Sequence, residues 1–290
     1  MGCINEITGH TKLTGLLGSP VAHSKSPLMH NEAFKELGLD YVYLCFDVPE
    51  NNLKTAFEGL KKLNVAGFNC TMPDKTLICE LVDELSPAAS MIGAVNTVVN
   101  DNGKYIGHNT DGIGYMQSVK DAGYNIIGEN MTLLGAGGAA SSILVQAALD
   151  GVKSINVFSL KDRFWGKAEK MVDAVNNNTD CNVTLYELGN DSELADSIAN
   201  SRILTNATSV GMAPNTDNCI IPDKSILSKD LIVSDIIYNP METKLIKMAK
   251  EQGCNTFNGL YMLLYQGAEA FKIWTGKDMP VEHIKKLYFD

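Results

Sequence analysis

The sequence has few basic residues and no long apolar run, and each of these shortages excludes a class of protein. Lys and Arg total 24 against 34 Asp and Glu, which gives a formal net charge of -10. A surface of that charge repels polyanions, so nucleic acid is not expected as a partner. No apolar stretch approaches the ~18 residues of a membrane-spanning helix, so no membrane association is expected either. A small anionic ligand stays open, because local donors and helix N-termini decide such sites.

Paired metal-ligating and disulfide-forming motifs are also missing. The seven cysteines are scattered and include no Cys-x-x-Cys pair, which predicts reduced, mostly buried thiols. Together with an N-terminus that lacks a basic apolar leader, this pattern predicts a cytoplasmic protein. The five histidines show no paired spacing with cysteine or carboxylate, so no metal is expected.

What is present indicates an ordinary globular protein of two α/β halves. The chain has 290 residues and a hydrophobic content of 45%, enough for two domains with sizeable cores. From Leu13 to about Val99, short apolar runs alternate with amphipathic stretches, as in β-α units around a largely parallel sheet. A second series with the same rhythm runs from Met131 to Ile236. Residues 109–125 between them predict a linker helix, and residues 259–274 predict an apolar helix that returns to the first half.

The second series opens with a glycine motif typical of dinucleotide-binding proteins. Gly135, Gly137 and Ala140 follow the Gly-x-Gly-x-x-Gly/Ala spacing, directly between a predicted strand and a predicted helix. The first glycine permits a tight turn, the second lets backbone N–H groups approach a pyrophosphate, and the alanine lets helix and sheet pack closely. Asp162 follows the next predicted strand, where a ribose hydroxyl would lie. A turn that merely packs a helix on a strand is the plainer alternative, and the paired context favours dinucleotide binding.

Four polar clusters lie at ends or loops of the first series. They are Ser24–Pro27, Asn69–Lys75, Gly93–Thr97 and Gly107–Asp111. In an open α/β sheet, ligands gather beyond the carboxyl ends of the strands, so these clusters are expected to converge. Taken singly, each residue has a plainer role. Ser24 or Ser26 would cap a helix ahead of Pro27, Lys75 would be a solvated lysine, and Asp111 would cap the linker helix.

In this order the clusters resemble the shikimate dehydrogenase family, and the resemblance spans nearly the whole chain. It continues through the Gly-Ala-Gly-Gly-Ala-Ala loop, residues 206–212, residues 235–240 and residues 258–267. The C-terminal half is most similar to the quinate/shikimate branch, particularly at 161–164 and 274–278. The resemblance implies an enzyme that interconverts shikimate and 3-dehydroshikimate with NAD(P), and that also accepts quinate. Its partners would be small molecules, and the assembly a monomer or homodimer.

The implied fold is α/β, with a mixed, mainly parallel substrate domain and a Rossmann domain. The substrate domain would span residues 1–110 and be completed by 258–290, with the Rossmann domain at 111–257. The implied catalytic residues are Lys75 and Asp111. The implied substrate-binding residues are Ser24, Ser26, Asn69, Thr71, Asn96, Tyr238 and Gln266, with Ser24 and Ser26 holding the carboxylate. The implied cofactor-binding residues are Gly135, Ala136, Gly137, Gly138, Ala139, Ser159, Lys161, Asp162, Ser209, Ile236 and Gly259.

Elementary chemistry agrees with this assignment. Oxidation of a secondary alcohol needs a hydride acceptor and a base for the hydroxyl proton, held in line. Lys75 is suited to be that base if its pKa is lowered, with Asp111 orienting it and binding the same hydroxyl. Two alternatives are a dehydrogenase for another small polar substrate and a non-catalytic nucleotide-binding regulator. The serine pair, the asparagine cluster and the lysine oppose the first, and the presence of both Lys75 and Asp111 opposes the second.

The loop after the second strand of the second series bears on cofactor choice. Family members that prefer NADP typically place an arginine there, and this chain has Leu160 at that position. Asp162 is suited to accept hydrogen bonds from a free ribose hydroxyl and to repel a 2′-phosphate, unless Lys161 or Arg163 offsets it. NAD is therefore the expected cofactor, with NADP as a tolerated second.

Overall fold

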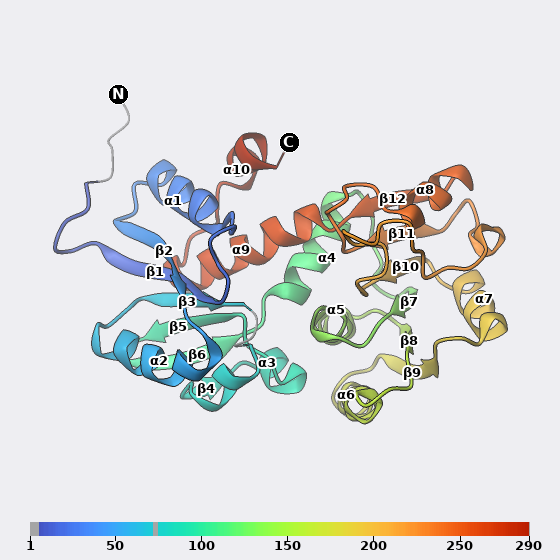
Figure 1. Ribbon diagram of the computed structural model, residues 1–290, viewed down its shortest axis with the longest axis horizontal. Helices are drawn as coiled ribbons and strands as arrows, with labels where there is room; N and C mark the ends of the chain where they lie inside the picture. The colour runs from blue at the N-terminus through green and yellow to red at the C-terminus, as the bar shows by residue number, and fades with distance from the viewer. Residues whose placement is uncertain (1–5, 72–74, 290) are drawn as a thin grey trace. The chain divides into compact units, whose positions relative to one another are not determined.

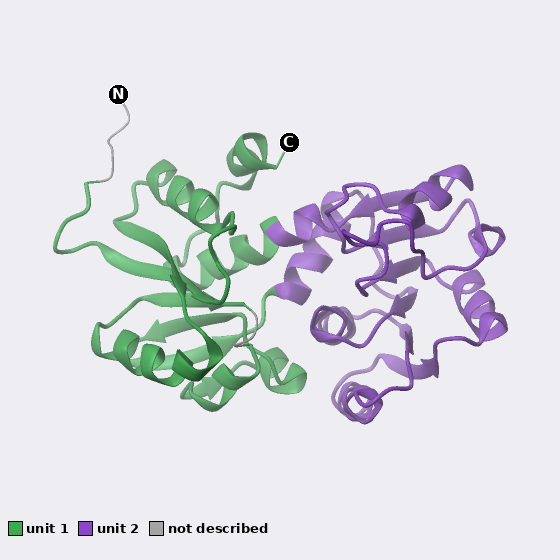
Figure 2. Cartoon of the chain, viewed as in Figure 1, with its two compact units in different colours: residues 1–110, 264–290 green, residues 111–263 purple. Residues whose placement is uncertain are grey.

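A computed structural model describes residues 6–71 and 75–289 of the chain, so Met72, Pro73 and Asp74 of the second polar cluster lie outside the described residues. Figure 1 traces the helices and strands. The chain divides into two compact units, which Figure 2 colours separately. Unit 1 comprises residues 1–110 and 264–290, and unit 2 comprises residues 111–263. The domain boundary was expected after residue 257. The two units divide after residue 263, inside helix α9 (Leu260–Thr275).

Unit 1 is built on a mixed six-stranded sheet in the order β2-β1-β3-β5-β6-β4. Strand β1 pairs in parallel with β2 and β3, and β4 with β6, whereas β3–β5 and β5–β6 are antiparallel. The strands are β1 (Lys12–Gly18), β2 (Tyr41–Asp47), β3 (Gly67–Cys70), β4 (Glu84–Leu85), β5 (Thr97–Asp101) and β6 (Lys104–His108).

Helices cover both faces of this sheet. Its helical segments are α1 (Ser26–Glu36), α2 (Leu53–Lys62), α3 (Pro87–Ile92), α10 (Val281–Tyr288) and the short 3-10 turns η1 (Glu50–Asn52) and η2 (Leu77–Glu80). On one face, Phe57 of α2 packs edge-on against Phe68 and Tyr105. On the other, aromatic side chains of α1 and α9 stack together, with Phe34 and Phe271 5.0 Å apart between ring centroids. Gly67 is essential to this second face, because a Cβ there would lie 2.4 Å from the Trp274 ring.

Unit 2 has a six-stranded sheet that is parallel throughout, in the order β12-β11-β10-β7-β8-β9. Its strands are β7 (Asn130–Leu134), β8 (Ser154–Ser159), β9 (Asn182–Glu187), β10 (Ile203–Asn206), β11 (Ile232–Asp235) and β12 (Asn255–Asn258). Counted in chain order this is the doubly wound arrangement 3-2-1-4-5-6, in which the strand order reverses between the first and fourth strands. Here that switch point lies between β7 and β10.

Helices cover both faces of the second sheet as well. They are α4 (Asp111–Asp121), α5 (Gly138–Leu149), α6 (Trp165–Asn178), α7 (Asp191–Ala199), α8 (Lys244–Glu251) and the 3-10 turn η3 (Lys224–Ile226). One apolar cluster joins Leu194 and Ile198 of α7 and Leu245 of α8 to Leu134 and Val233 of the strands. Helix α4 packs against α5 so closely that a Cβ on Gly112 would lie 2.2 Å from the Ser142 carbonyl oxygen.

The predicted fold class is confirmed, including the mixed first sheet, the Rossmann arrangement of the second and the return of the last apolar helix to unit 1. One expectation about the polar clusters needs correction. Asn96 does not follow the carboxyl end of a strand, because it precedes β5, which runs antiparallel to β3. The reversal brings the start of β5 beside the end of β3, so Asn96 still meets Asn69.

Candidate active site

In unit 1 a buried hydrogen-bond network joins three of the predicted substrate residues, namely Asn69, Asn96 and the backbone of Gln266. The network centres on Asn69 at the end of β3, whose side chain is 7% exposed. Its amide nitrogen donates to the Asn96 carbonyl oxygen at 3.1 Å and to Thr97 Oγ1 at 3.0 Å. Its Oδ1 accepts from the Tyr43 hydroxyl at 2.8 Å. Both amide hydrogens of Asn69 are therefore used inside the protein, which makes it an organiser of neighbouring side chains.

The network continues from Asn96 to helix α9. Asn96 Oδ1 accepts from Thr97 Oγ1 at 3.0 Å and from the Thr110 backbone N–H at 2.8 Å. Asn96 Nδ2 donates to Thr110 Oγ1 at 3.0 Å, and that hydroxyl donates in turn to the Gln266 carbonyl oxygen at 2.9 Å. Thr110 therefore joins the side chain of Asn96 to the backbone of Gln266 in α9.

Ser24 and Ser26 lie at the start of α1, on the other side of the same network. Ser24 Oγ accepts from the Ser26 backbone N–H at 3.2 Å, while Lys25 occupies the N-cap position without a side-chain cap. Burial raises the pKa of the Cys45 thiol and of the Tyr43 phenol, and Ser24 and Ser26, respectively, act in the opposite direction. Both serines are half-buried.

Tyr43 was not singled out from the sequence, and its hydroxyl belongs to the network around Asn69. Its ring is fully buried, and burial raises its pKa well above the usual range, so the phenol stays protonated. A signal was present in the sequence. A tyrosine among alternating buried positions of a strand needs a polar partner for its hydroxyl, because a buried hydroxyl without one is costly.

Lys75 and Thr71 flank the three residues outside the description. The Thr71 N–H donates to the Leu17 carbonyl oxygen at 2.9 Å, which continues the β1–β3 pairing. The Lys75 carbonyl oxygen accepts from the Val95 N–H at 2.8 Å, immediately before Asn96. The half-buried Lys75 is therefore anchored by its backbone beside the asparagine network, which is not the arrangement of a lysine on an outer helix face.

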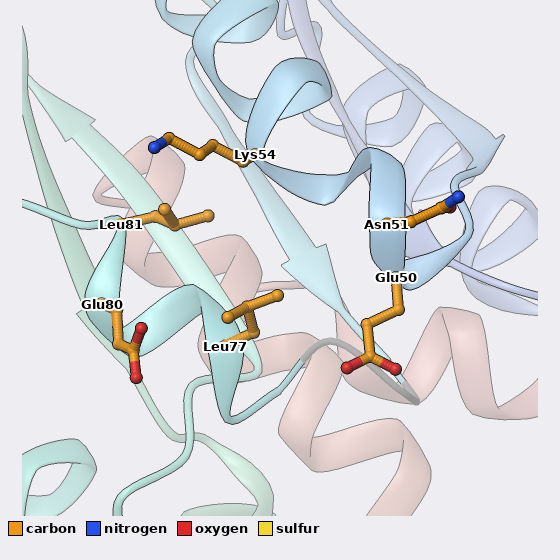
Figure 3. Close-up of a pocket in the computed structure, with 6 residues that line it drawn as sticks. All are labelled: Glu50, Asn51, Lys54, Leu77, Glu80 and Leu81. Carbon is orange, nitrogen blue, oxygen red and sulfur yellow. The ribbon is translucent and has the colours of Figure 1, made fainter.

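A separate open groove of about 790 Å³ lies in unit 1. Its walls come from η1, the start of α2 and η2, and Figure 3 shows their side chains. They are Glu50, Asn51, Lys54, Leu77, Glu80 and Leu81. None of the predicted site residues lines this groove, so the substrate chemistry is assigned to the hydrogen-bonded network instead.

The glycine loop of unit 2 has the conformation that phosphate binding requires. Gly135 has φ +105°, and a Cβ there would lie 2.9 Å from Thr208 Cγ2. Gly137 is the N-cap residue of α5, and no side chain caps the first turn. Gly137, Gly138 and Ala139 line the open side, with no atom within 4 Å of a Cβ built on either glycine. Ala140 is buried against the sheet. A dinucleotide phosphate fits the uncapped N–H donors of this helix.

The loop after β8 carries the residues expected at the adenosine ribose. Asp162 Oδ1 accepts from the Phe164 N–H at 2.8 Å just before α6, which leaves its second oxygen for a ligand. Lys161 Nζ lies 3.9 Å from a Glu187 carboxylate oxygen and 5.6 Å from the centre of the Trp165 ring. Leu160 is exposed. Ser159, by contrast, is the last residue of β8 and is half-buried.

The remaining predicted residues of unit 2 lie at the carboxyl ends of β10, β11 and β12, or at the start of α4. Ser209 and Tyr238 are exposed on the loops after β10 and β11. Gly259 follows β12, and a Cβ there would lie 1.8 Å from the Ile236 carbonyl oxygen, so these two positions are in backbone contact. Asp111 is the first residue of α4 and is half-buried.

The sequence matches two family models. Residues 16–98 match the shikimate dehydrogenase substrate binding domain, and residues 259–287 match the shikimate 5'-dehydrogenase C-terminal domain. A relative from Listeria monocytogenes serotype 4b (strain F2365), named shikimate dehydrogenase (NADP(+)), is 53% identical over 284 residues, covering 98% of each chain.

Solved structures give the same picture. The crystal structure of a shikimate 5-dehydrogenase from Listeria monocytogenes, in complex with shikimate and NAD, has a TM-score of 0.95 at 53% identity, with 98% of each chain covered. A quinate dehydrogenase from Corynebacterium glutamicum, in complex with NAD, has a TM-score of 0.84 at 31% identity, covering 95% of this chain and 98% of the other. Among the described residues, none of the helices is both long and apolar enough to span a membrane.

Proposed function

The chain belongs to the shikimate dehydrogenase family, and from that premise we propose the role of each site residue and the range of substrates and cofactors. The protein is an oxidoreductase that interconverts shikimate and 3-dehydroshikimate with a nicotinamide cofactor. The observation that best supports the assignment of its site is the network that joins Tyr43, Asn69, Asn96, Thr110 and the Gln266 backbone within one unit.

We propose that unit 1 is the substrate domain. Ser24 and Ser26 donate to the substrate carboxylate, and Thr71, Asn96 and Gln266 contact the ring hydroxyls. Asn69 acts chiefly by holding Tyr43 and Thr97, since its amide hydrogens are already bonded. Tyr238 of unit 2 supplies a further contact near the carboxylate. Neutral donors of this kind bind an anion without placing a full charge near the reacting carbon.

The proton chemistry falls to Lys75 and Asp111. A nicotinamide, when bound at unit 2, supplies the hydride acceptor or donor. In the oxidation direction, the substrate hydroxyl loses its proton to the neutral Lys75 amine as the carbonyl double bond forms, and Asp111 accepts a hydrogen bond that orients the pair. In the reduction direction, the Lys75 ammonium returns that proton to the carbonyl oxygen.

A matrix of initial rates tests the proposal directly. Shikimate and quinate are each offered with NAD and NADP, and absorbance of the reduced nicotinamide is followed. Turnover of shikimate with at least one cofactor is expected. A protein that binds nucleotide and gives no absorbance change with any pair would be a regulator, and the proposed roles would fall. Quinate is proposed as a second substrate because of the match to the quinate dehydrogenase. Its extra hydroxyl lies on the carbon that carries the carboxylate, so the space near Ser24 and Ser26 decides its rate.

Removal of both serine hydroxyls is expected to weaken substrate binding more than it slows chemistry. For Ser24→Ala with Ser26→Ala we expect KM for shikimate to rise about 30-fold and kcat to fall less than threefold, because carboxylate anchoring is mostly uniform binding. Steady-state kinetics measures both. Ser86→Ala is the matched control, since Ser86 accepts from the Ala89 N–H at the start of α3 in the same unit. If the double variant keeps the wild-type KM, the two hydroxyls only shape the helix start.

The cofactor is NAD or NADP, and we propose that NAD is preferred and NADP accepted. Support comes from the loop after β8, where Glu187 lies beside Lys161 and Asp162 keeps one oxygen for a ribose hydroxyl. The name of the Listeria relative, shikimate dehydrogenase (NADP(+)), favours NADP instead. The ratio of kcat/KM for NAD and NADP is therefore the deciding measurement.

Asp162→Ala is expected to shift that ratio toward NADP about tenfold, because it removes a negative charge beside the 2′-phosphate. Asp223→Ala controls for loss of a helix-start contact, since Asp223 accepts from the Ser225 N–H in the same way. An unchanged ratio would mean that Asp162 serves only the start of α6.

The cytoplasm is proposed as the location, and a monomer or homodimer as the assembly. Six cysteines of the described chain form no disulfide bond, which suits a reducing compartment. They are Cys45, Cys70, Cys79, Cys181, Cys219 and Cys254. Light scattering coupled to gel filtration distinguishes the two assemblies.

A further inference from the structure

The carboxylate of Asp235 is buried at the end of β11 and is not used by the chemistry described above. Its side chain is fully covered, and burial raises its pKa. Oδ1 accepts from Asn206 Nδ2 and from the Ile237 N–H, each at 3.1 Å. Oδ2 accepts from the Thr243 hydroxyl at 2.7 Å. Burial of a carboxylate costs free energy, and the three hydrogen bonds fix its orientation. The carboxylate in turn holds in place the three segments of chain that carry the donors.

The donors lie at the end of β10, in the loop after β11 and at the start of α8. Asn206 ends β10, and its Oδ1 accepts from the N–H and the hydroxyl of Thr208 at 3.1 and 2.7 Å. Its Nδ2 also donates to the Val210 carbonyl oxygen at 3.3 Å, which completes the hold on the loop that carries Ser209. Ile237 lies in the loop after β11, between Ile236 and Tyr238. Thr243 is the N-cap of α8 and accepts from the Ile246 N–H.

These loops follow the fourth and fifth strands of the doubly wound sheet. In this topology a dinucleotide crosses the switch point, with its adenosine half over the end of the second strand. The nicotinamide half therefore lies over the fourth and fifth strands, which are β10 and β11 here. Asp235, at the end of β11, would thus lie beneath the nicotinamide half, and the loop of Asp162 would lie beside the adenosine half.

We propose that Asp235 is a positioning residue for the nicotinamide. By holding the 206–210 loop and the 236–238 loop at once, it sets the surface on which the reactive ring rests, without touching the ring itself. The proposal rests on the assignment of unit 2 as the cofactor domain.

The test separates the two halves of the cofactor. Dissociation constants are measured by titration for two ligands. One is the reduced cofactor preferred by the wild type, and the other is the same molecule without nicotinamide. The second ligand is ADP-ribose for NADH, or 2′-phospho-ADP-ribose for NADPH. For Asp235→Leu we expect the Kd of the reduced cofactor to rise at least tenfold, while the Kd of the fragment changes less than twofold.

A conservative variant and a control sharpen the result. Asp235→Asn is expected to recover most of the lost affinity, because its oxygen can accept from Asn206 and Ile237 while its amide donates to Thr243 Oγ1. Thr132→Val is the matched control, since Thr132 is buried in the same sheet and bonds Ser197 and Ser201, which precede β10, whereas the two loops follow β10 and β11. It is expected to leave both constants unchanged.

The outcomes are distinguishable. Equal weakening of cofactor and fragment by Asp235→Leu, or no recovery with Asn, would overturn the positioning role. If Asp235→Leu does not fold, Thr243→Val removes one donor and carries the same comparison, with a smaller rise for the reduced cofactor alone. A wild type that binds neither ligand would refute the assignment of the cofactor domain instead.

Discussion

Lys75→Ala is expected to lower kcat about a thousandfold, while KM for shikimate changes no more than a few-fold. A positioned general acid or base contributes about 10²- to 10⁴-fold, and its loss acts on the transition state rather than on binding. Steady-state rates in both directions measure the effect. Lys54→Ala is the matched control, because Lys54 lies in the same unit and lines the separate groove of η1, α2 and η2. If Lys75→Ala retains near-normal turnover, another group moves the proton.

Asp111→Asn completes this test as a double-mutant cycle with Lys75→Ala. The single change is expected to lower turnover, and the double variant is expected to be scarcely slower than Lys75→Ala alone. Residues that act as one unit give losses that do not add, whereas independent residues give losses that multiply in rate. Multiplicative losses would assign Lys75 and Asp111 separate tasks.

Acidification is expected to destabilise the protein through His30, which no step of the chemistry uses. His30 is fully buried in the aromatic cluster of unit 1, 4.5 Å from the Tyr43 ring, and neither ring nitrogen has a partner in the described structure. Burial lowers the pKa of His30 from 6.5 to about 3. Below pH 6.5 the unfolded chain therefore binds a proton that the folded chain does not.

As a consequence, the free energy of unfolding decreases when the pH is lowered. The decrease is about 1.4 kcal/mol per pH unit, or about 2 kcal/mol from pH 6.5 to pH 5. Stability is retained above pH 6.5, and the loss levels off near pH 3. His30→Phe is expected to abolish that slope, which urea unfolding at several pH values measures. His10→Gln is the control, since His10 is exposed. The same slope in wild type and His30→Phe would show that other groups titrate.

Local patterns were enough to predict the fold class, and they failed where pairing depends on distant strands. The β-α rhythm predicted most of the strands and helices because each apolar run must be buried in its own layer. The hairpin of β5 and β6 was not predicted. The predicted β-α series ended at about Val99, and residues 97–108 form strands through the pairing of β5 with both β3 and β6.

The site residues also divide into those with local roles, which the sequence predicted, and those with distant partners, which it did not. Gly135, Gly137 and Ala140 were found from the sequence because their roles depend on a turn and a helix start that are local. Tyr43 and Asp235 were not found as functional residues. Each acts through partners that are distant in sequence, such as Asn69 for Tyr43 and Asn206 for Asp235. A polar residue in an apolar strand is the one local sign of such a role.

The aromatic face of unit 1 has a consequence for the order in which the chain acquires structure during synthesis. Unit 2 is one continuous stretch, but unit 1 needs residues 264–290, which are made after the whole of unit 2. Trp274 fills the space that Gly67 leaves open and donates to the Val98 carbonyl oxygen at 2.9 Å. Until that ring is in place, α1 alone covers this face and the surface around Gly67 stays open. Unit 2 can thus fold first during synthesis, whereas unit 1 is completed only when residues 264–290 have been made.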